Sequence, residues 1–98
     1  MSKKPTLSRW DAADALKTDQ DCALYLEAVM DEADGDGKLI AAALGDIARA
    51  RGMMKVARRS GLAREALYRS LSADGNPSLT TLLKVTKALG LKLSVTPG

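Results

Sequence analysis

The amino-acid sequence predicts one all-α domain of five helices, followed by a short C-terminal β-strand. The length of 98 residues fits a single domain. Apolar residues recur at helical spacing in several segments, and clusters of Gly, Asp, Asn and Pro separate these segments. Aromatic residues make up only 3% of the chain, so the core has to be built from Leu, Ile, Val, Met and Ala, which suits packed helices.

The first helix is predicted to begin after Thr18, and residues 1–18 are predicted to form an N-terminal arm. The Thr18 hydroxyl can accept a hydrogen bond from the backbone N–H of Asp21, and the carboxylates of Asp19 and Asp21 favour the positive end of a helix. The apolar stripe of this helix consists of Cys22, Leu26, Val29 and Ala33. The turn formers of residues 34–37 are expected to end it.

Four further helices and a strand complete the predicted domain, which spans residues 19–98. The helices are expected at residues 38–51, 54–60, 64–71 and 78–89, the last of them opening at Pro77 or Ser78. The last helix is expected to place one set of side chains on a common face: Leu79, Leu82, Leu83, Thr86 and Leu89. Residues 91–96 alternate between apolar and polar side chains, which is typical of a β-strand. A lone strand leaves its backbone groups unpaired, so we expect it to pair, with a second copy of the chain as one option.

The net charge of +3 is divided unevenly along the chain. Residues 1–37 carry four basic and nine acidic side chains, a balance of −5, whereas residues 38–98 carry eleven basic and three acidic ones, a balance of +8. This asymmetry indicates two surfaces with different partners. The basic part is the one that a polyanion such as DNA meets first.

Residues 53–72 have the pattern of a helix-turn-helix. Such a motif needs a small residue where its two helices approach closely, and Ala57 stands there. It also needs a residue that tolerates positive φ in the turn, and Gly61 follows four positions later. Four apolar residues are expected to hold the two helices to the core: Val56, Leu62, Leu67 and Leu71.

The polar residues on the outer face of the second helix of this motif are candidates for reading bases in the DNA major groove. An arginine can donate two parallel hydrogen bonds to guanine, and a glutamate can accept one from the amino group of cytosine. The predicted base-contacting set is Ala63, Arg64, Glu65, Tyr68 and Arg69. The predicted phosphate-contacting set, which positions the protein without reading sequence, is Lys55, Arg58, Arg59, Ser78, Thr80 and Thr81. The alternative is that these two helices are only a structural part of an ordinary helical bundle and that their outer arginines are solvated without binding DNA.

A wider part of the chain, residues 40–95, resembles the addiction-module antidote proteins of the phage-repressor-like (Xre-type) helix-turn-helix family. The resemblance is carried by the run Ala41-Ala42-Ala43-Leu44-Gly45-Asp46-Ile47-Ala48-Arg49-Ala50-Arg51-Gly52, by Gly61-Leu62-Ala63-Arg64-Glu65-Ala66-Leu67-Tyr68, by Gly75-Asn76-Pro77-Ser78-Leu79 and by Leu89-Gly90-Leu91-Lys92-Leu93. It implies a five-helix, lambda-repressor-like domain in an antitoxin of a type II toxin–antitoxin module. Such an antitoxin binds and neutralises a RelE/HigB-like toxin, an RNA-cleaving protein, forms a homodimer and represses its own operon.

The chain departs from this family's pattern at two places. Many relatives have Ser or Thr at the start of the recognition helix, where this chain has Ala63. Many also begin the preceding helix with a Gln that supports a phosphate contact, whereas Met54 and Lys55 stand here. The base preference of a relative therefore does not transfer to this chain.

The acidic front of the chain offers a second candidate surface. A ribonuclease toxin binds RNA and so has a basic active site, which favours an acidic partner. We expect toxin binding to involve the arm and the first helix, through Trp10, Asp14, Asp21, Glu27 and Asp31. The alternative is that these carboxylates only keep their surface soluble.

Other classes of protein find little support. The chain has no His and no Gly-rich phosphate loop, so we expect no enzyme, no cofactor and no metal site. Residues 32–37 imitate the front of a calcium-binding loop, but Ala43 stands where its bidentate carboxylate belongs. A protein-interaction module without specific DNA binding remains as the alternative function.

The setting is expected to be the cytoplasm. No segment approaches the ~20 apolar residues of a membrane span, and the first residues do not form a signal peptide. Cys22 is the one cysteine, so it has no partner for an intrachain disulfide and is expected to be a small buried apolar residue.

Overall fold

Five helices make up the described part of the fold, and the sequence predicts each of them to within about two residues. The computed structural model describes residues 15–72 and 75–98. The helices are α2 (Asp19–Ala33), α3 (Gly37–Arg51), α4 (Met53–Ser60), α5 (Arg64–Ser70) and α6 (Leu79–Ala88). The predicted all-α class is therefore confirmed for this part of the chain.

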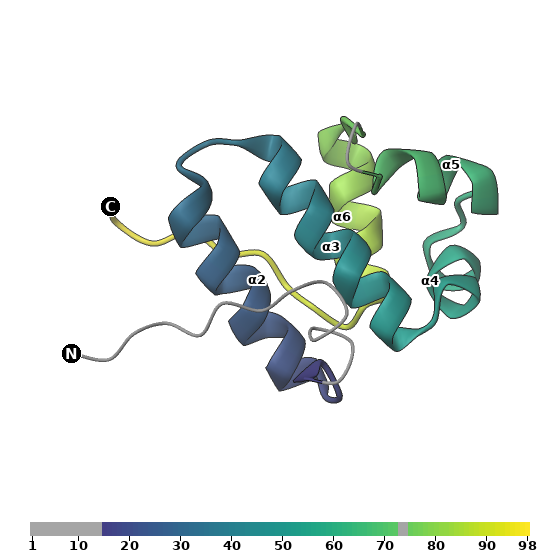
Figure 1. The fold of residues 1–98 in the computed structure, drawn as a ribbon, viewed down its shortest axis with the longest axis horizontal. Coiled ribbons are helices and arrows are strands. Elements are labelled where there is room, and N and C mark those ends of the chain that lie inside the picture. Colours follow the sequence, from purple (N-terminus) through teal and green to yellow (C-terminus); the bar gives the residue numbers. More distant parts are fainter. Residues whose placement is uncertain (1–14, 73–74) are drawn as a thin grey trace.

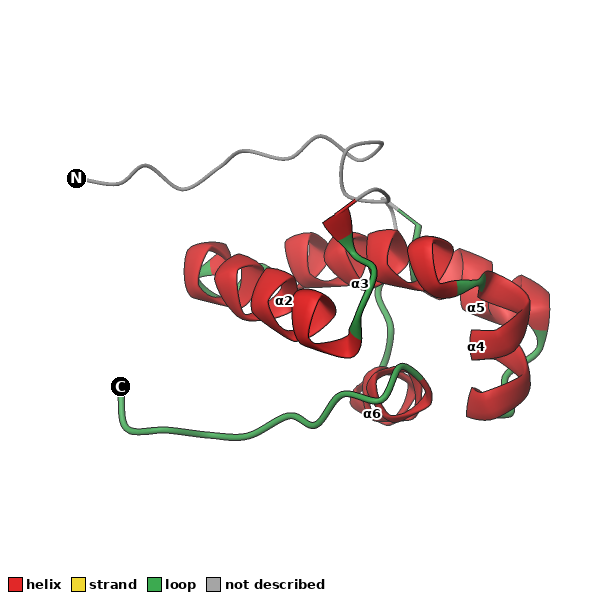
Figure 2. Ribbon diagram, turned by 90° about the horizontal axis from the view of Figure 1, so that it is seen from below, coloured by secondary structure: helices red, strands yellow, loops and turns green. Residues whose placement is uncertain are grey.

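The helices are arranged around α3, which lies in the middle of the molecule (Figure 1). The helix α2 lies along one side of α3, while α4 and α5 lie toward the opposite end of the long axis. Seen from below, α6 and the C-terminal segment lie on one side of the α2–α3 pair (Figure 2). The helices α2 and α5 thus lie on opposite sides of α3 along the longest dimension of the molecule, which measures 43 Å.

The starts of α2 and α3 are each held by a capping side chain. Thr18 accepts a hydrogen bond from the backbone N–H of Asp21 at 3.0 Å, as expected. Asp36 accepts from the N–H of Lys38 at 2.9 Å and so caps α3. Each cap satisfies a backbone donor that has no partner inside its own helix, which fixes where the helix begins.

The core is aliphatic, and α3 contributes the longest buried run of residues to it. Six consecutive α3 residues, 43–48, are all buried. The largest fully buried side chains are Leu44, Ile47, Leu67, Leu71, Val56, Val85 and Cys22. The prediction that Cys22 is a small buried apolar residue is therefore confirmed, and burial raises the pKa of its thiol.

One carboxylate is buried within this core, and two neighbouring side chains satisfy it. Asp46 on α3 is only 7% exposed. Its Oδ2 accepts a hydrogen bond from the hydroxyl of Tyr25 at 2.9 Å, and its Oδ1 lies 3.1 Å from Nη2 of Arg49. Because Tyr25 belongs to α2, this contact ties α2 to α3 at a defined position along both helices.

The predicted C-terminal strand is wrong, because residues 91–98 contain no strand. The N–H of Leu91 donates to the carbonyl of Thr86 at 2.9 Å, which closes the end of α6 and redirects the chain. Leu91 and Leu93 then pack, partly buried, against the core. The alternation that predicted a strand therefore pins an irregular segment to the core instead of pairing it with another strand.

The five residues of α6 that were predicted to share a face are buried only in part. Thr86 and Leu89 are 2% and 5% exposed, and Leu82 is half-buried. Leu79 and Leu83, however, are 68% and 48% exposed. The buried face is centred on Val85 and Leu89, and the helical repeat of 3.6 residues turns positions 79 and 83 away from it.

The approach of α3 to the end of α5 depends on a glycine. A Cβ atom added to Gly45 would lie 2.7 Å from the backbone oxygen of Leu71. That distance is too short for a carbon–oxygen contact, and a backbone atom cannot move aside without shifting α5. Gly45 thus permits a separation between the two helices that no other residue type allows.

We expect Gly45→Ala to lower the free energy of unfolding by about 1–3 kcal/mol through this overpacking, despite the better helix propensity of Ala. Urea denaturation followed by circular dichroism measures the change. Gly37→Ala is the matched control, because a Cβ at Gly37 meets nothing within 4 Å. Equal stability of the Gly45→Ala variant and the unmodified protein would contradict this account of the contact.

Candidate nucleic-acid interface

The helices α4 and α5 form a short helix–turn–helix unit where the sequence predicts one. Gly61 joins them in the left-handed conformation, with φ of 76°, as the turn requires. The Oγ of Ser60 donates to the carbonyl of Ala57 at 3.2 Å and accepts from the N–H of Leu62 at 3.3 Å. These hydrogen bonds brace the turn, so the direction of α5 relative to α4 is defined locally.

The apolar residues predicted to hold this unit to the core do so. Val56, Leu67 and Leu71 are at most 1% exposed, and Leu62 packs partly buried against the core. With Leu67 fixed inward, the helical repeat directs the polar residues of α5 toward solvent. The orientation of the outer face of α5 therefore follows from burial of the opposite face.

The predicted base-contacting residues come together on that outer face. The side chains of Arg64, Glu65, Tyr68 and Arg69 line one shallow hollow on the surface of α5. The guanidinium carbon of Arg64 lies 5.5 Å from the centre of the Tyr68 ring, which is close enough for a cation–π contact. Ala63 is exposed at the start of α5, and no side chain caps that helix, as its sequence predicts.

The predicted phosphate-contacting residues fall into two groups. Arg58 and Arg59 are exposed on α4, and Lys55 is half-buried there. At the start of α6, Ser78 accepts from the N–H of Thr81 at 3.2 Å and donates to its hydroxyl at 3.1 Å. These two hydroxyls serve first to cap α6, whereas Thr80 beside them is exposed.

A second hollow contains two cations that sequence reasoning missed. Lys84 and Lys87 of α6 lie together with Arg59 of α4, and the hollow is lined by Arg59, Ser60, Lys84, Lys87, Ala88 and Gly90. The lysines stand three residues apart on the solvent side of α6, which the sequence does show. Their closeness to Arg59 depends on the packing of α4 against α6, which no local pattern reveals.

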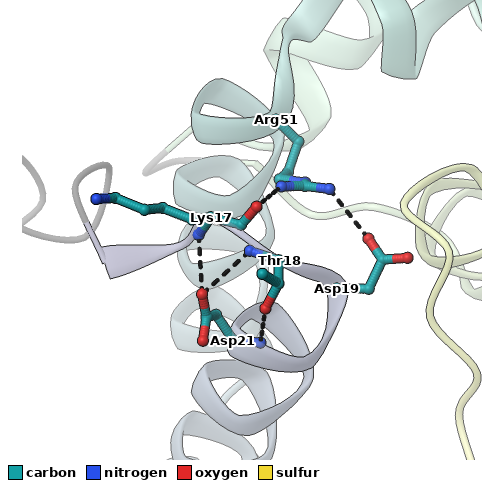
Figure 3. Close-up of polar contacts among 5 residues, drawn as sticks. All are labelled: Lys17, Thr18, Asp19, Asp21 and Arg51. Carbon is teal, nitrogen blue, oxygen red and sulfur yellow. Dashed lines mark hydrogen bonds and ion pairs between the residues drawn. The ribbon is translucent and has the colours of Figure 1, made fainter.

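The toxin-binding set predicted on the arm and the first helix is divided in the structure. Trp10 and Asp14 lie outside the described residues. Glu27 and Asp31 are exposed one helical turn apart on α2. Asp21 has a structural task instead: its Oδ2 accepts from the backbone N–H groups of Lys17 and Thr18, both at 3.1 Å (Figure 3).

An arginine from α3 fastens the same end of α2. Nη2 of Arg51 lies 3.2 Å from Oδ1 of Asp19, and Nη1 of Arg51 donates to the carbonyl of Lys17 (Figure 3). The hydrogen bonds from the N–H groups of Lys17 and Thr18 lower the pKa of Asp21 below its ordinary value of 3.8. The start of α2 is therefore a charge-dependent cap tied to the end of α3.

No group of three or more His, Cys, Asp or Glu side chains within residues 15–72 and 75–98 is placed to hold a metal ion. None of the helices in this part of the chain is long and apolar enough to cross a membrane.

Comparison with known proteins assigns this helical protein to a family. The family described as "Probable addiction module antidote protein" matches residues 6–97. An uncharacterized protein of Haemophilus influenzae is 45% identical over 89 residues, which cover 91% of this chain and 90% of the relative. No solved structure matches the chain significantly. The chain belongs to this family of addiction module antidotes, which bears out the antidote part of the resemblance seen in the sequence.

We expect Asp21→Asn to lower the free energy of unfolding, and to do so by an amount that depends on pH. The pKa of Asp21 is lowered in the folded state, so its ionised carboxylate stabilises the fold above pH 3.8, and this contribution is lost as the pH falls through the folded-state pKa. The stability difference between the unmodified protein and the variant should therefore be largest near neutral pH and shrink below pH 3.8. Urea denaturation across this pH range measures it. Glu27→Gln on the exposed face of α2 is the control, and a difference independent of pH would refute the charged cap.

Proposed function

We propose that this protein is a DNA-binding antitoxin of a type II toxin–antitoxin module that represses its own operon. The antidote family supports a regulatory, non-enzymatic role and a toxin partner in general. One observation carries the DNA-binding part: a short helix–turn–helix unit presents two arginines, Arg64 and Arg69, on one exposed helix face. This arrangement supports assignment to the Xre-type, lambda-repressor-like helix-turn-helix proteins acting in the cytoplasm.

In this proposal α5 enters the major groove and reads base edges. Arg64 and Arg69 donate to guanine, Glu65 accepts from cytosine, and Ala63 and Tyr68 contact the edges of neighbouring bases. Because Arg64 lies over the ring of Tyr68, the two side chains restrict each other's rotamers before DNA arrives. Such preordering reduces the entropy that binding has to overcome.

Phosphate contacts come from the cations and hydroxyls around α5. Lys55, Arg58, Arg59 and Thr80 can approach the backbone directly, while Ser78 and Thr81 hold the start of α6 in place. We add Lys84 and Lys87 to this set, since they share a hollow with Arg59. Such contacts strengthen binding to any sequence and make it sensitive to salt.

The toxin is proposed to be a RelE/HigB-like ribonuclease that docks on the acidic helix α2. The sequence of α2, DQDCALYLEAVMDEA, contains five acidic residues and no basic one. Glu27 and Asp31 face solvent and can meet a cationic surface, together with Trp10 and Asp14 of the arm. Carboxylates near the C-terminal end of a helix interact unfavourably with the helix dipole. A cationic partner would offset this unfavourable interaction, which the folded chain alone does not.

The positions of α2 and α5 allow both partners to bind at once. The two helices lie at opposite ends of the molecule (Figure 1). A toxin on the outer face of α2 would therefore leave α5 accessible to DNA. The alternative function, a protein-interaction module without specific DNA binding, is favoured by the same acidic helix, and DNA titration separates the two.

We expect the protein to bind a DNA fragment from upstream of its own gene more tightly than a scrambled fragment. Arg64→Ala/Arg69→Ala should remove this preference and weaken binding at least tenfold, because each bidentate contact to guanine contributes about 1–3 kcal/mol of discrimination. Lys84→Ala/Lys87→Ala removes the same charge from α6. It should weaken binding to both fragments equally and reduce the salt dependence by a slope of roughly 0.9 for each lost phosphate contact.

Fluorescence anisotropy at two salt concentrations distinguishes these outcomes. Weak binding of the unmodified protein to both fragments, abolished by salt, would mean that only a basic surface meets phosphate. The interaction module would then become the better description of the protein.

We expect Glu27→Gln/Asp31→Asn to slow association with the toxin several-fold and to reduce its salt dependence, because exposed charges act mainly on the association rate. Surface plasmon resonance with the toxin encoded beside this gene measures both effects. Glu65→Gln, at the opposite end of the molecule, is the control. Unchanged association of the α2 variant would eliminate α2 as the toxin surface.

A further inference from the structure

The charged outer face of α5 also carries an aromatic side chain. Within residues 64–70, all of which the structure describes, Tyr68 is the one large apolar side chain with high exposure, at 41%. It lines the same hollow as Arg64, Glu65 and Arg69. Its ring therefore lies at the surface that is proposed to meet DNA, and its chemistry differs from that of the charged groups around it.

The position of the Tyr68 ring is coupled to that of Arg64. The two residues stand four positions apart, so their side chains are neighbours on one face of the helix. The guanidinium carbon of Arg64 lies 5.5 Å from the centre of the ring. Side chains on a helix lean toward its start, and the first residues of a recognition helix are those that meet base edges. The ring and the guanidinium are therefore expected to reach the same part of the groove.

The two groups can bind different features of neighbouring base pairs. The edge of the Arg64 guanidinium can donate to O6 and N7 of guanine while its face stays on the ring. Consecutive base pairs are about 3.4 Å apart, so a ring centred 5.5 Å from the guanidinium carbon comes beside an adjacent pair. Thymine alone among the four bases presents an apolar group in the major groove, its 5-methyl. The ring thus has an apolar partner where the adjacent pair contains thymine.

We propose that Arg64 and Tyr68 together read a step of two base pairs, a G·C pair beside an A·T pair whose thymine methyl packs against the Tyr68 ring. The inference rests on the proposed function, because it concerns the same face of α5, and it names the kind of DNA that this face selects. Tyr68 acts here through its ring and not through its hydroxyl. Withdrawing one methyl group from water strengthens binding about fourfold.

Selection of bound sequences from a library of random DNA duplexes, with the full chain, tests the step. The sequences retained by the unmodified protein should share a G·C pair with an A·T pair directly beside it. Tyr68→Ala should lose the preference for that A·T pair, whereas preferences at pairs outside the step should persist. Met54→Ala removes an exposed apolar side chain from α4 and is the matched control, which should retain the full preference.

Uracil in place of the selected thymine tests the methyl contact directly, because uracil differs from thymine only in lacking the 5-methyl group. In fluorescence anisotropy, this replacement should weaken binding of the unmodified protein about fourfold. Tyr68→Phe keeps the ring and should show the same fourfold loss. Tyr68→Ala should bind both duplexes more weakly, and uracil should cause it no further loss.

The outcomes separate this inference from the function on which it rests. If the unmodified protein enriches no sequence, specific DNA binding and the reading of thymine both fall. If it enriches a sequence that lacks the A·T pair, or binds the uracil duplex as tightly as the thymine duplex, the reading by Tyr68 is refuted and DNA binding stands. A fourfold uracil effect that persists in Tyr68→Ala would assign the methyl to another residue and would equally overturn the proposal.

Discussion

The close packing around α3 is the constraint on which the other helices depend. Six consecutive residues of this helix are buried, and four of them are Ala or Gly or carry a short polar side chain. Small side chains let neighbouring backbones approach, which compensates for a core with almost no aromatic bulk. The helices α2 and α4 pack directly on α3, and the end of α5 reaches it at Gly45. The candidate interface on α5 is therefore positioned from the centre of the molecule outward.

Helix positions could be predicted from the sequence because their ends carry local chemistry. Thr18 and Gly61 act through hydrogen bonds or backbone conformation within a few residues, so no knowledge of the fold is needed to recognise them. The C-terminal segment could not be predicted in this way. The same alternation of apolar residues can form one face of a β-strand or can anchor an irregular segment to the core. Which of the two structures forms depends on where the core lies, and the local sequence does not show that.

The candidate site shows the same division between local and distant information. The exposure of Arg64 and Arg69 could be predicted from the helical period and from the burial of Leu67, which lies three residues from Arg64 and two from Arg69. The hollow that joins Lys84 to Arg59 unites residues far apart in the chain, and the task of Asp21 as a cap competes with any role at the surface. Neither could be derived from spacing alone, because each depends on what else the same side chain touches.

The contacts of Gly45 and Asp46 have a mechanical consequence. Consecutive residues of α3 hold the two ends of the molecule: the carbonyl of Leu71 lies over Gly45, and the hydroxyl of Tyr25 binds Asp46. The end of α5 and the middle of α2 are thus fastened to a single helical turn, without a hinge between them. A partner bound to α2, as proposed, would consequently be held at a fixed angle and distance from a duplex bound by the proposed interface on α5, and the protein would act as a rigid bracket between the two macromolecules.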